Sequence, residues 1–306
     1  MNMLNRLQIS SLICPIICCL TLALCATLAP ASNAAPVRAL WVWNGSSIIT
    51  SSSQETTFFN FIAAPYGKSA NAVGKLYFDS GTIAQFSNST WVSEMSSFIT
   101  TAHSKGVSVY FLCGDPTWAE SSGESTGLSY MTAVINFNAA HTSSQFNGFQ
   151  YDVEPYALST WPSTTLENGL ENLLWQAYNL KAASDPALAL SETIPFWYDS
   201  AAYNYLDQGV MNLTDEVAIM DYTNSAANII SYPAAEINYA SANGKYCWVG
   251  VETNQESGSP QTTFYSLGDT DMESVLSTDY STFLTQSCFG GYCIDSYTGW
   301  SALGAT

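Results

Sequence analysis

Two acidic residues near the middle of the chain, Asp152 and Glu154, have the type and spacing of an acid–base pair. They lie in the stretch FNGFQYDVEPY, residues 146–156, whose apolar start favours a β-strand. In a strand, side chains at positions i and i+2 point to the same face. Two carboxyl groups held side by side raise each other's pKa, so one of them can keep a proton near neutral pH. The pair therefore predicts acid–base chemistry at the end of a strand.

Aromatic and polar side chains follow several other predicted strands. Sugar rings stack on aromatic planes, while carboxyl groups act on the glycosidic oxygen. The combination therefore predicts a carbohydrate substrate. The residues predicted to contact it, besides the pair, are Trp43, Trp118, Gln150, Tyr156, Glu192, Trp197, Asp221, Glu252, Asp295 and Trp300.

Short apolar stretches alternate with helical patterns throughout the chain after residue 36. The expected strands are residues 37–43, 73–78, 107–112, 148–154, 187–193, 216–222, 246–252 and 290–295. The expected helices are residues 52–62, 91–104, 128–140, 164–183, 201–208, 233–243 and 271–283. Repeated strand-then-helix units with continuously apolar strands predict an α/β protein, a single (β/α)8 TIM barrel whose catalytic residues lie at the carboxyl ends of the strands. An open doubly wound sheet is the alternative, but no Gly-rich phosphate turn follows the first strand.

The first 35 residues have the pattern of a secretory signal peptide. Arg6 is the only early charge, an apolar stretch covers about residues 9–28, and small residues follow at 31–35. We therefore expect residues 1–35 to be removed, leaving residues 36–306 as one barrel domain that is secreted or periplasmic. A retained membrane anchor is the alternative, and a lipoprotein site at Cys25 is disfavoured by the large Leu24 before it.

The charge of the mature part excludes one class of partner. All 25 acidic residues lie after residue 36, together with only six of the seven basic ones, since Arg6 belongs to the leader. Such a chain repels phosphate backbones, so nucleic-acid binding is not expected.

No later segment is apolar enough to span a bilayer. We expect a monomer that acts on carbohydrate without a cofactor.

Four cysteines remain in the mature part: Cys113, Cys247, Cys288 and Cys293. Disulfides are permitted in an exported chain, and four cysteines allow three pairings, of which Cys288 with Cys293 is the closest in sequence. No histidine lies near these cysteines, so neither a zinc site nor a catalytic thiol is expected.

The stretch around the acidic pair resembles the family 18 glycoside hydrolases, which include chitinases and endo-β-N-acetylglucosaminidases. The pattern of that family, FDGxDxDxE, matches FNGFQYDVE at the phenylalanine, the glycine, Asp152 and Glu154. Asn147 and Gln150 stand where the family has its earlier aspartates. The sixth expected strand is similar to the Met-x-Tyr-Asp of the family, with Thr223 in place of the aspartate. After the eighth strand, Trp300 offers an aromatic ring where the family keeps a tryptophan floor.

This resemblance implies a mechanism assisted by the substrate. Glu154 would be the general acid, and Asp152 would orient the acetamido group that attacks the anomeric carbon. Tyr222 would steady the oxazolinium intermediate. Gln150 can hydrogen-bond Asp152 but cannot share its negative charge, so the proton relay behind Asp152 differs from that of the family.

Two other interpretations of the sequence remain open. In a two-carboxylate glycosidase, Glu154 would be the acid and Glu252 the nucleophile or base; carboxyl separations of about 5–5.5 Å suit retention and about 6.5–9.5 Å inversion. In a non-hydrolytic, chitinase-like carbohydrate-binding protein, the aromatic cleft would persist without the acid. The presence of Glu154 argues against this second interpretation.

Overall fold

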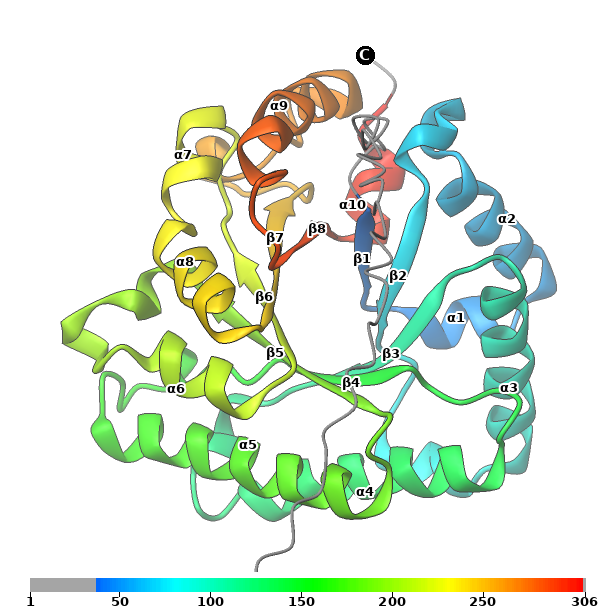
Figure 1. Cartoon of the computed structure of the whole chain (residues 1–306). Helices are drawn as coiled ribbons and strands as arrows, with labels where there is room; N and C mark the ends of the chain where they lie inside the picture. The colour runs from blue at the N-terminus through cyan, green and yellow to red at the C-terminus, as the bar shows by residue number, and fades with distance from the viewer. Residues whose placement is uncertain (1–36, 305–306) are drawn as a thin grey trace, which may run out of the picture. The chain divides into compact units, whose positions relative to one another are not determined.

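Eight parallel strands close into a barrel in the order β1 to β8, and helices surround it (Figure 1). A computed structural model of the chain describes residues 37–304, so the predicted signal peptide lies outside the described residues. The strands are β1 (Arg38–Val42), β2 (Val73–Phe78), β3 (Ser108–Cys113), β4 (Gly148–Tyr151), β5 (Ala189–Pro195), β6 (Glu216–Met220), β7 (Tyr246–Glu252) and β8 (Phe289–Asp295). The predicted (β/α)8 barrel is confirmed.

The helices lie on the outside of the barrel (Figure 1). They are α1 (Gly45–Ile49), α2 (Ser52–Ala63), α3 (Ser89–Ser104), α4 (Glu124–Ala140), α5 (Thr164–Ser184), α6 (Leu206–Leu213), α7 (Ala226–Ser231), α8 (Ala234–Asn243), α9 (Gly268–Phe283) and α10 (Tyr297–Ala302). Sequence did not predict α1, α7 or α10. The helix expected at 201–208 begins later, because Asn204 and Tyr205 have left-handed φ angles of 54° and 55° that interrupt it.

Strand β4 ends three residues earlier than the sequence predicted. Residues 148–154 were expected to form this strand, but its ladder stops at Tyr151. Asp152 and Glu154 therefore lie in the segment just beyond the strand, between it and the short 3₁₀ turn at Pro155–Ala157. The acidic pair sits on a loop anchored to the barrel rim.

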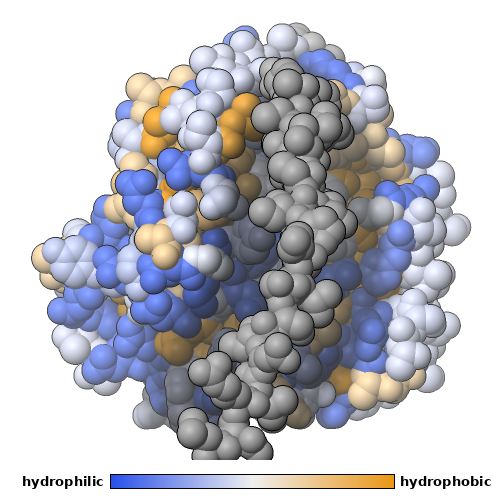
Figure 2. All heavy atoms as spheres, in the orientation of Figure 1, coloured by the Kyte–Doolittle hydropathy of each residue, from blue (hydrophilic) through white to orange (hydrophobic). Residues whose placement is uncertain are grey.

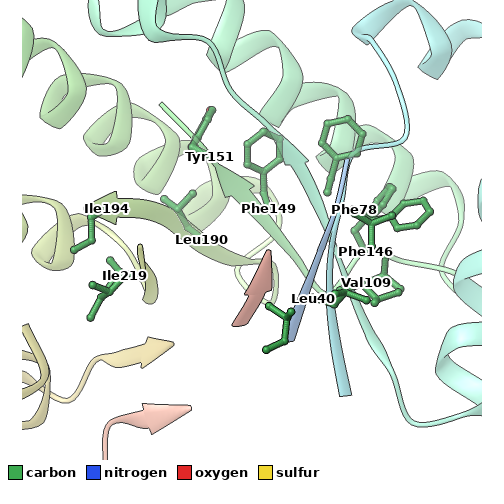
Figure 3. Close-up of a cluster of buried hydrophobic side chains, with 14 of the residues drawn as sticks. Leu40, Phe78, Val109, Phe146, Phe149, Tyr151, Leu190, Ile194 and Ile219 are labelled. Atoms are coloured by element: carbon green, nitrogen blue, oxygen red, sulfur yellow. The ribbon is translucent and has the colours of Figure 1, made fainter. Parts of the chain in front are cut away.

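Two layers of side chains hold the barrel together. The outward faces of the strands pack under the helices, as Leu40, Phe78, Phe149 and Leu190 illustrate in Figure 3, and each of these four side chains is fully buried. A second, smaller cluster fills the barrel interior; its larger members are Trp41, Tyr77, Tyr110, Leu112 and Trp248. On the face drawn in Figure 2, hydrophilic residues predominate, with hydrophobic ones in small groups between them.

A buried ion pair lies within this interior layer. Lys75 Nζ is 2.6 Å from both carboxylate oxygens of Glu216. Tyr77 Oη and Trp248 Nε1 also donate to Glu216, at 2.9 and 3.2 Å, and the ammonium group lies 4.2 Å from the centre of the Tyr110 ring. The carboxylate is thus fully hydrogen-bonded, which a buried charge requires.

We expect Lys75→Met to lower the free energy of unfolding by about 3–5 kcal/mol, because it leaves the Glu216 charge buried without its cation. Urea denaturation at constant pH measures the change. Lys105→Met, at an exposed position, is the matched control and should have little effect. The double variant Lys75→Met/Glu216→Leu should recover stability. A loss below about 1 kcal/mol in Lys75→Met would contradict this account of the interior.

The expectation of a disulfide is wrong for the described residues, in which Cys113, Cys247, Cys288 and Cys293 are free thiols. Cys293 points into the barrel with the interior cluster. Cys288 lies outside it, with Sγ 3.3 Å from the carbonyl oxygen of Ile237 in α8. The two residues nearest in sequence therefore face opposite sides of β8.

Across residues 37–304, no helix has both the length and the apolarity needed to cross a bilayer.

Candidate active site

The carboxyl ends of the strands bring three carboxyl groups to the inner rim of the barrel. Asp152 follows β4, while Glu252 and Asp295 end β7 and β8 and are direct register partners. Asp152 N donates to the carbonyl oxygen of Cys113 at 3.0 Å. Gly114 permits this approach, since a Cβ at that position would lie 1.8 Å from the carbonyl oxygen of Asp152. Backbone contacts between β3 and β4 thus fix the start of the acidic loop.

Glu154 is half-buried at this rim. The hydroxyl of Tyr156 donates a hydrogen bond to Glu154 Oε1. Burial raises the pKa of Glu154, and the charge of Asp295 adds to the rise, while the bond from Tyr156 opposes it. A carboxyl group with a raised pKa keeps its proton to higher pH, which is the property that a general acid needs.

Asp152 is the second half-buried carboxyl group of the acidic loop. Burial raises its pKa to about 8, with further contributions from the charges of Glu154 and Asp295. A hydrogen bond from Thr193, on β5, opposes the rise. Asp152 is therefore protonated near neutral pH and can donate a hydrogen bond as well as accept one.

Asp295 connects three strand ends. Its Oδ1 accepts a hydrogen bond from Trp43 Nε1 at 2.9 Å, and its Oδ2 accepts one from Tyr222 Oη, also at 2.9 Å. Trp43 follows β1 and Tyr222 follows β6, so Asp295 ties these two aromatic side chains to the end of β8. Burial raises the pKa of Asp295, while its hydrogen bonds from Trp43 and Tyr222 act in the opposite direction.

Glu252 lies beside Asp295 and is 5% exposed. Its Oε1 accepts hydrogen bonds from the backbone N–H of Thr253 at 2.7 Å and from both N and Nδ2 of Asn254 at 2.5 and 2.8 Å. Burial, followed by the charge of Asp295, raises the pKa of Glu252 to about 8. Like Asp152, Glu252 is thus neutral below that pH.

A cleft of about 420 Å³ opens next to Asp152. Trp43 and Trp118 contribute aromatic surface to it, and Asp79 and Asp115 contribute carboxyl groups. Trp43 is 42% exposed, so part of its indole is open to a ligand. A second aromatic group lies beside Glu154, where the rings of Tyr156 and Trp197 are 5.2 Å apart. This arrangement suits a sugar chain laid against aromatic surface with carboxyl groups along it.

Four residues predicted to contact substrate lie away from the cleft. Gln150 is fully buried one layer below, where its Oε1 accepts from Trp41 and its Nε2 donates to Ser191. Glu192 points outward from β5 and accepts from the backbone N–H of Val153 at 3.0 Å. It therefore positions the acidic loop from behind.

Asp221 and Trp300 are also placed in the protein interior. Asp221 has no exposed surface, and burial raises its pKa to about 8, with the charge of Asp279 in α9 adding to the rise. Trp300 is fully buried, and its Nε1 donates to Asp269 at 2.8 Å. Neither residue is brought to the rim. The other predicted site residues, including Tyr222, line the cleft or belong to the carboxyl groups at the rim and their contacts, except Trp197, which packs against Tyr156.

Sequence reasoning missed the residues that orient these carboxyl groups. The Thr193 hydroxyl donates to the carbonyl oxygen of Tyr151, next to Asp152, and Thr253 and Asn254 hold Glu252. Their only signal was a position at the end of a predicted strand. Within residues 37–304, no group of three or more His, Cys, Asp and Glu side chains is arranged to hold a metal ion.

Comparison with solved structures places this geometry in a known fold. A GH18 chitinase from Pseudoalteromonas aurantia is similar with a TM-score of 0.57 and 12% sequence identity, over 86% of this chain and 94% of that one. A chitinase from Chromobacterium violaceum gives a TM-score of 0.54 and 10% identity, over 88% and 98% of the two chains. The barrel has the chitinase fold.

A third solved structure with the chitinase fold contains a sugar ligand. It is a class V chitinase variant from Nicotiana tobaccum in complex with NAG4, with a TM-score of 0.50 and 11% identity, over 89% of this chain and 99% of that one. No model of a known protein family matches the sequence, and no curated protein matches it either. At these identities the likeness establishes the fold alone.

Proposed function

We propose that this protein is a secreted glycoside hydrolase that cleaves a polysaccharide or glycan containing N-acetylhexosamine. The observation that carries the proposal is the acidic loop after β4. There, Glu154 and Asp152 are half-buried at the rim of an aromatic cleft, and burial raises the pKa of both. One solved structure with the chitinase fold contains bound NAG4, which supports N-acetylhexosamine as the sugar.

In this proposal Glu154 protonates the glycosidic oxygen. The hydroxyl of Tyr156 occupies Oε1, so Oε2 is the oxygen that carries the transferred proton. As the bond to the leaving sugar breaks, the acetamido oxygen of the substrate attacks the anomeric carbon, and Asp152 accepts a hydrogen bond from the acetamido N–H. The carboxylate of Glu154 then takes a proton from water, which opens the oxazolinium ring.

The route with Glu252 as nucleophile has less support. A nucleophilic carboxylate must be ionised, but the pKa of Glu252 is raised to about 8 and its Oε1 already accepts three hydrogen bonds. At neutral pH the protonated form predominates. The alternative is a carbohydrate-binding protein that does not hydrolyse its ligand, and the observation in its favour is Gln150. This residue stands where the family has an aspartate, and it bonds Trp41 and Ser191, so Asp152 has no carboxylate partner in the layer beneath it.

A substrate panel tests the proposal. The purified protein is incubated with oligomers of N-acetylglucosamine, of glucosamine and of glucose, and the products are separated by chromatography. We expect hydrolysis of the N-acetylated oligomers only. Asp152→Asn should lower kcat by about 10²-fold, because the acetamido group is no longer held for attack. Glu252→Gln should leave kcat within a few-fold of the wild type.

The opposite pattern, with Glu252→Gln inactive and Asp152→Asn nearly normal, would replace substrate assistance by the two-carboxylate route. Hydrolysis of glucose oligomers at a comparable rate would contradict the need for an acetamido group. If calorimetry shows that the oligomers bind but no product forms, the protein is a carbohydrate-binding protein and the proposed hydrolase activity is wrong.

A further inference from the structure

We infer that Asp295 is the positioning residue of the cleft: it is the ionised member of the Asp295–Glu252 pair and holds Trp43 and Tyr222 in place. The inference rests on the proposed function for its effect on catalysis, but the hydrogen-bonded group itself is a property of the resting protein. The resemblance of the sequence to family 18 assigns no role to an acid at this position.

Two hydrogen-bond donors converge on Asp295. The side chain is 8% exposed, and each of its oxygens accepts a hydrogen bond at 2.9 Å, one from the Trp43 indole and one from the Tyr222 hydroxyl. An indole N–H can only donate, so the oxygen facing Trp43 must be an acceptor. Two such bonds favour the carboxylate over the acid at Asp295.

Asp295 and Glu252 are register partners on β8 and β7, so the two carboxyl groups lie side by side at the rim. Two neighbouring buried carboxyl groups repel each other when both are ionised, so one of them keeps a proton. Asp295 uses both oxygens as acceptors, and Glu252 Oε1 already accepts from Thr253 and Asn254. The proton therefore lies on Glu252 Oε2. The pair carries one negative charge, and that charge is located on Asp295.

Among residues 37–304, the charged and titratable groups that act on the pair or feel its charge are Asp152, Glu154, Tyr222, Glu256 and Cys293, none of which is a cation. Lys75, in the barrel interior, is paired with Glu216. The network thus consists of one carboxylate stabilised by neutral donors.

The consequence for the substrate concerns Tyr222. Because its hydroxyl proton is donated to Asp295, the Tyr222 oxygen can offer only lone pairs to a ligand. The site then selects a sugar that presents a hydroxyl donor to Tyr222, while the acetamido N–H of the substrate is directed to Asp152. Asp295 also fixes the Trp43 ring on the other side.

The indole N–H resonance of Trp43 tests the assignment in the absence of substrate. The resonance is identified by its loss in Trp43→Phe and followed by ¹H–¹⁵N NMR while the pH is changed. In the wild type we expect it to move as the Asp295–Glu252 pair titrates. Asp295→Asn should abolish this pH dependence, and Glu252→Gln should shift it. An unchanged titration in Asp295→Asn would overturn the inference.

Steady-state kinetics on the best substrate of the panel tests the positioning role. Asp295→Asn and Tyr222→Phe should each lower kcat by about 10²-fold. The double variant should be no slower than the worse single variant, because Asp295 acts through Tyr222. Asp295→Glu should recover part of the activity, and Asp271→Asn, exposed on α9, is the control. Additive effects in the double variant would overturn the positioning role.

These two readouts separate the inference from the proposed function. If the wild type hydrolyses none of the oligomers, the proposed function fails, while the Trp43 titration still decides the state of Asp295. If the oligomers are hydrolysed but the pH dependence of the Trp43 resonance is the same in Asp295→Asn as in the wild type, only the inference fails. Circular dichroism confirms folding of each variant, and should Asp295→Asn not fold, the effect of Glu252→Gln on the Trp43 titration decides the outcome.

Discussion

Replacing Glu154 by glutamine is expected to lower kcat for N-acetylglucosamine oligomers by about 10³-fold, within the range of 10²–10⁴ that general acids contribute. Glutamine keeps the size of the side chain and can still accept the bond from Tyr156, but it has no proton to transfer. The loss should therefore appear in kcat more than in KM, since binding contacts remain. Initial rates over a range of oligomer concentrations separate the two.

The leaving group distinguishes loss of an acid from loss of structure. A dinitrophenyl glycoside departs without protonation, so Glu154→Gln should cleave it with a much smaller deficit than the oligomers. Glu94→Gln, the same substitution on the outer helix α3, is the matched control and should resemble the wild type. Equal deficits on both kinds of substrate would show that Glu154 is not the general acid. So would wild-type rates on the oligomers.

The pH profile of the wild type belongs to the same test. Because burial raises the pKa of Glu154, the group keeps its proton at a pH where an exposed glutamate has lost it. We therefore expect kcat/KM to fall on the alkaline side above this raised pKa. In Glu154→Gln, the residual activity should lack that alkaline limb.

The fold was predictable because the signal for it is local. The strands are short and mostly apolar, such as VGKLYF in β2, and the helix that follows β2, α3, begins after the capping residue Asn88. Asp152 and Glu154 were predictable for a related reason, since a dense motif identifies them within one segment. The parallel barrel then fixes the end of the strand at which they lie.

The network around Asp295 was not predictable, because closing the barrel creates it. Trp43 and Asp295 are 252 residues apart in sequence, and only the pairing of β1 with β8 brings them together. The misplaced residues show a different limit. Asp221 and Tyr222 are neighbours, yet alternation along the strand sends one toward the helices and the other to the cleft. The sequence motif alone does not show which of the two residues faces the cleft, because that depends on the register of the strand in the sheet.

Buried carboxyl groups outside the cleft should make the stability of this protein depend steeply on pH. Asp221 and Glu236, in the region of β6 and α8, are fully buried, and burial raises their pKa values to about 8 and about 9. Both oxygens of Asp221 have no hydrogen-bond partner among the described residues. In the unfolded chain both groups ionise near pH 4. Between the two pKa values the folded state holds a proton that the unfolded state has released.

The free energy of unfolding should therefore be highest in acid and fall as the pH rises from about 5 to 8. Each group contributes a decrease of about 1.4 kcal/mol per pH unit in that range. Chemical denaturation at a series of pH values measures the slope. Asp221→Asn and Glu236→Gln replace the acid by an uncharged amide, so each should flatten the slope and raise stability at pH 8 by about 4 kcal/mol.

An exposed aspartate provides the comparison that isolates burial as the cause. Asp271→Asn, on the outer face of α9, removes the same charge without removing a desolvation cost, so its slope should match that of the wild type. A wild type whose stability rises from pH 5 to 8 would contradict the account, because the buried groups would then ionise more easily in the folded state. A slope that Asp221→Asn and Glu236→Gln leave unchanged would assign the pH dependence to the carboxyl groups of the cleft. The expected result links the two halves of the structure: the carboxyl groups under the helices and those at the rim both favour a protein that is folded and protonated in acid.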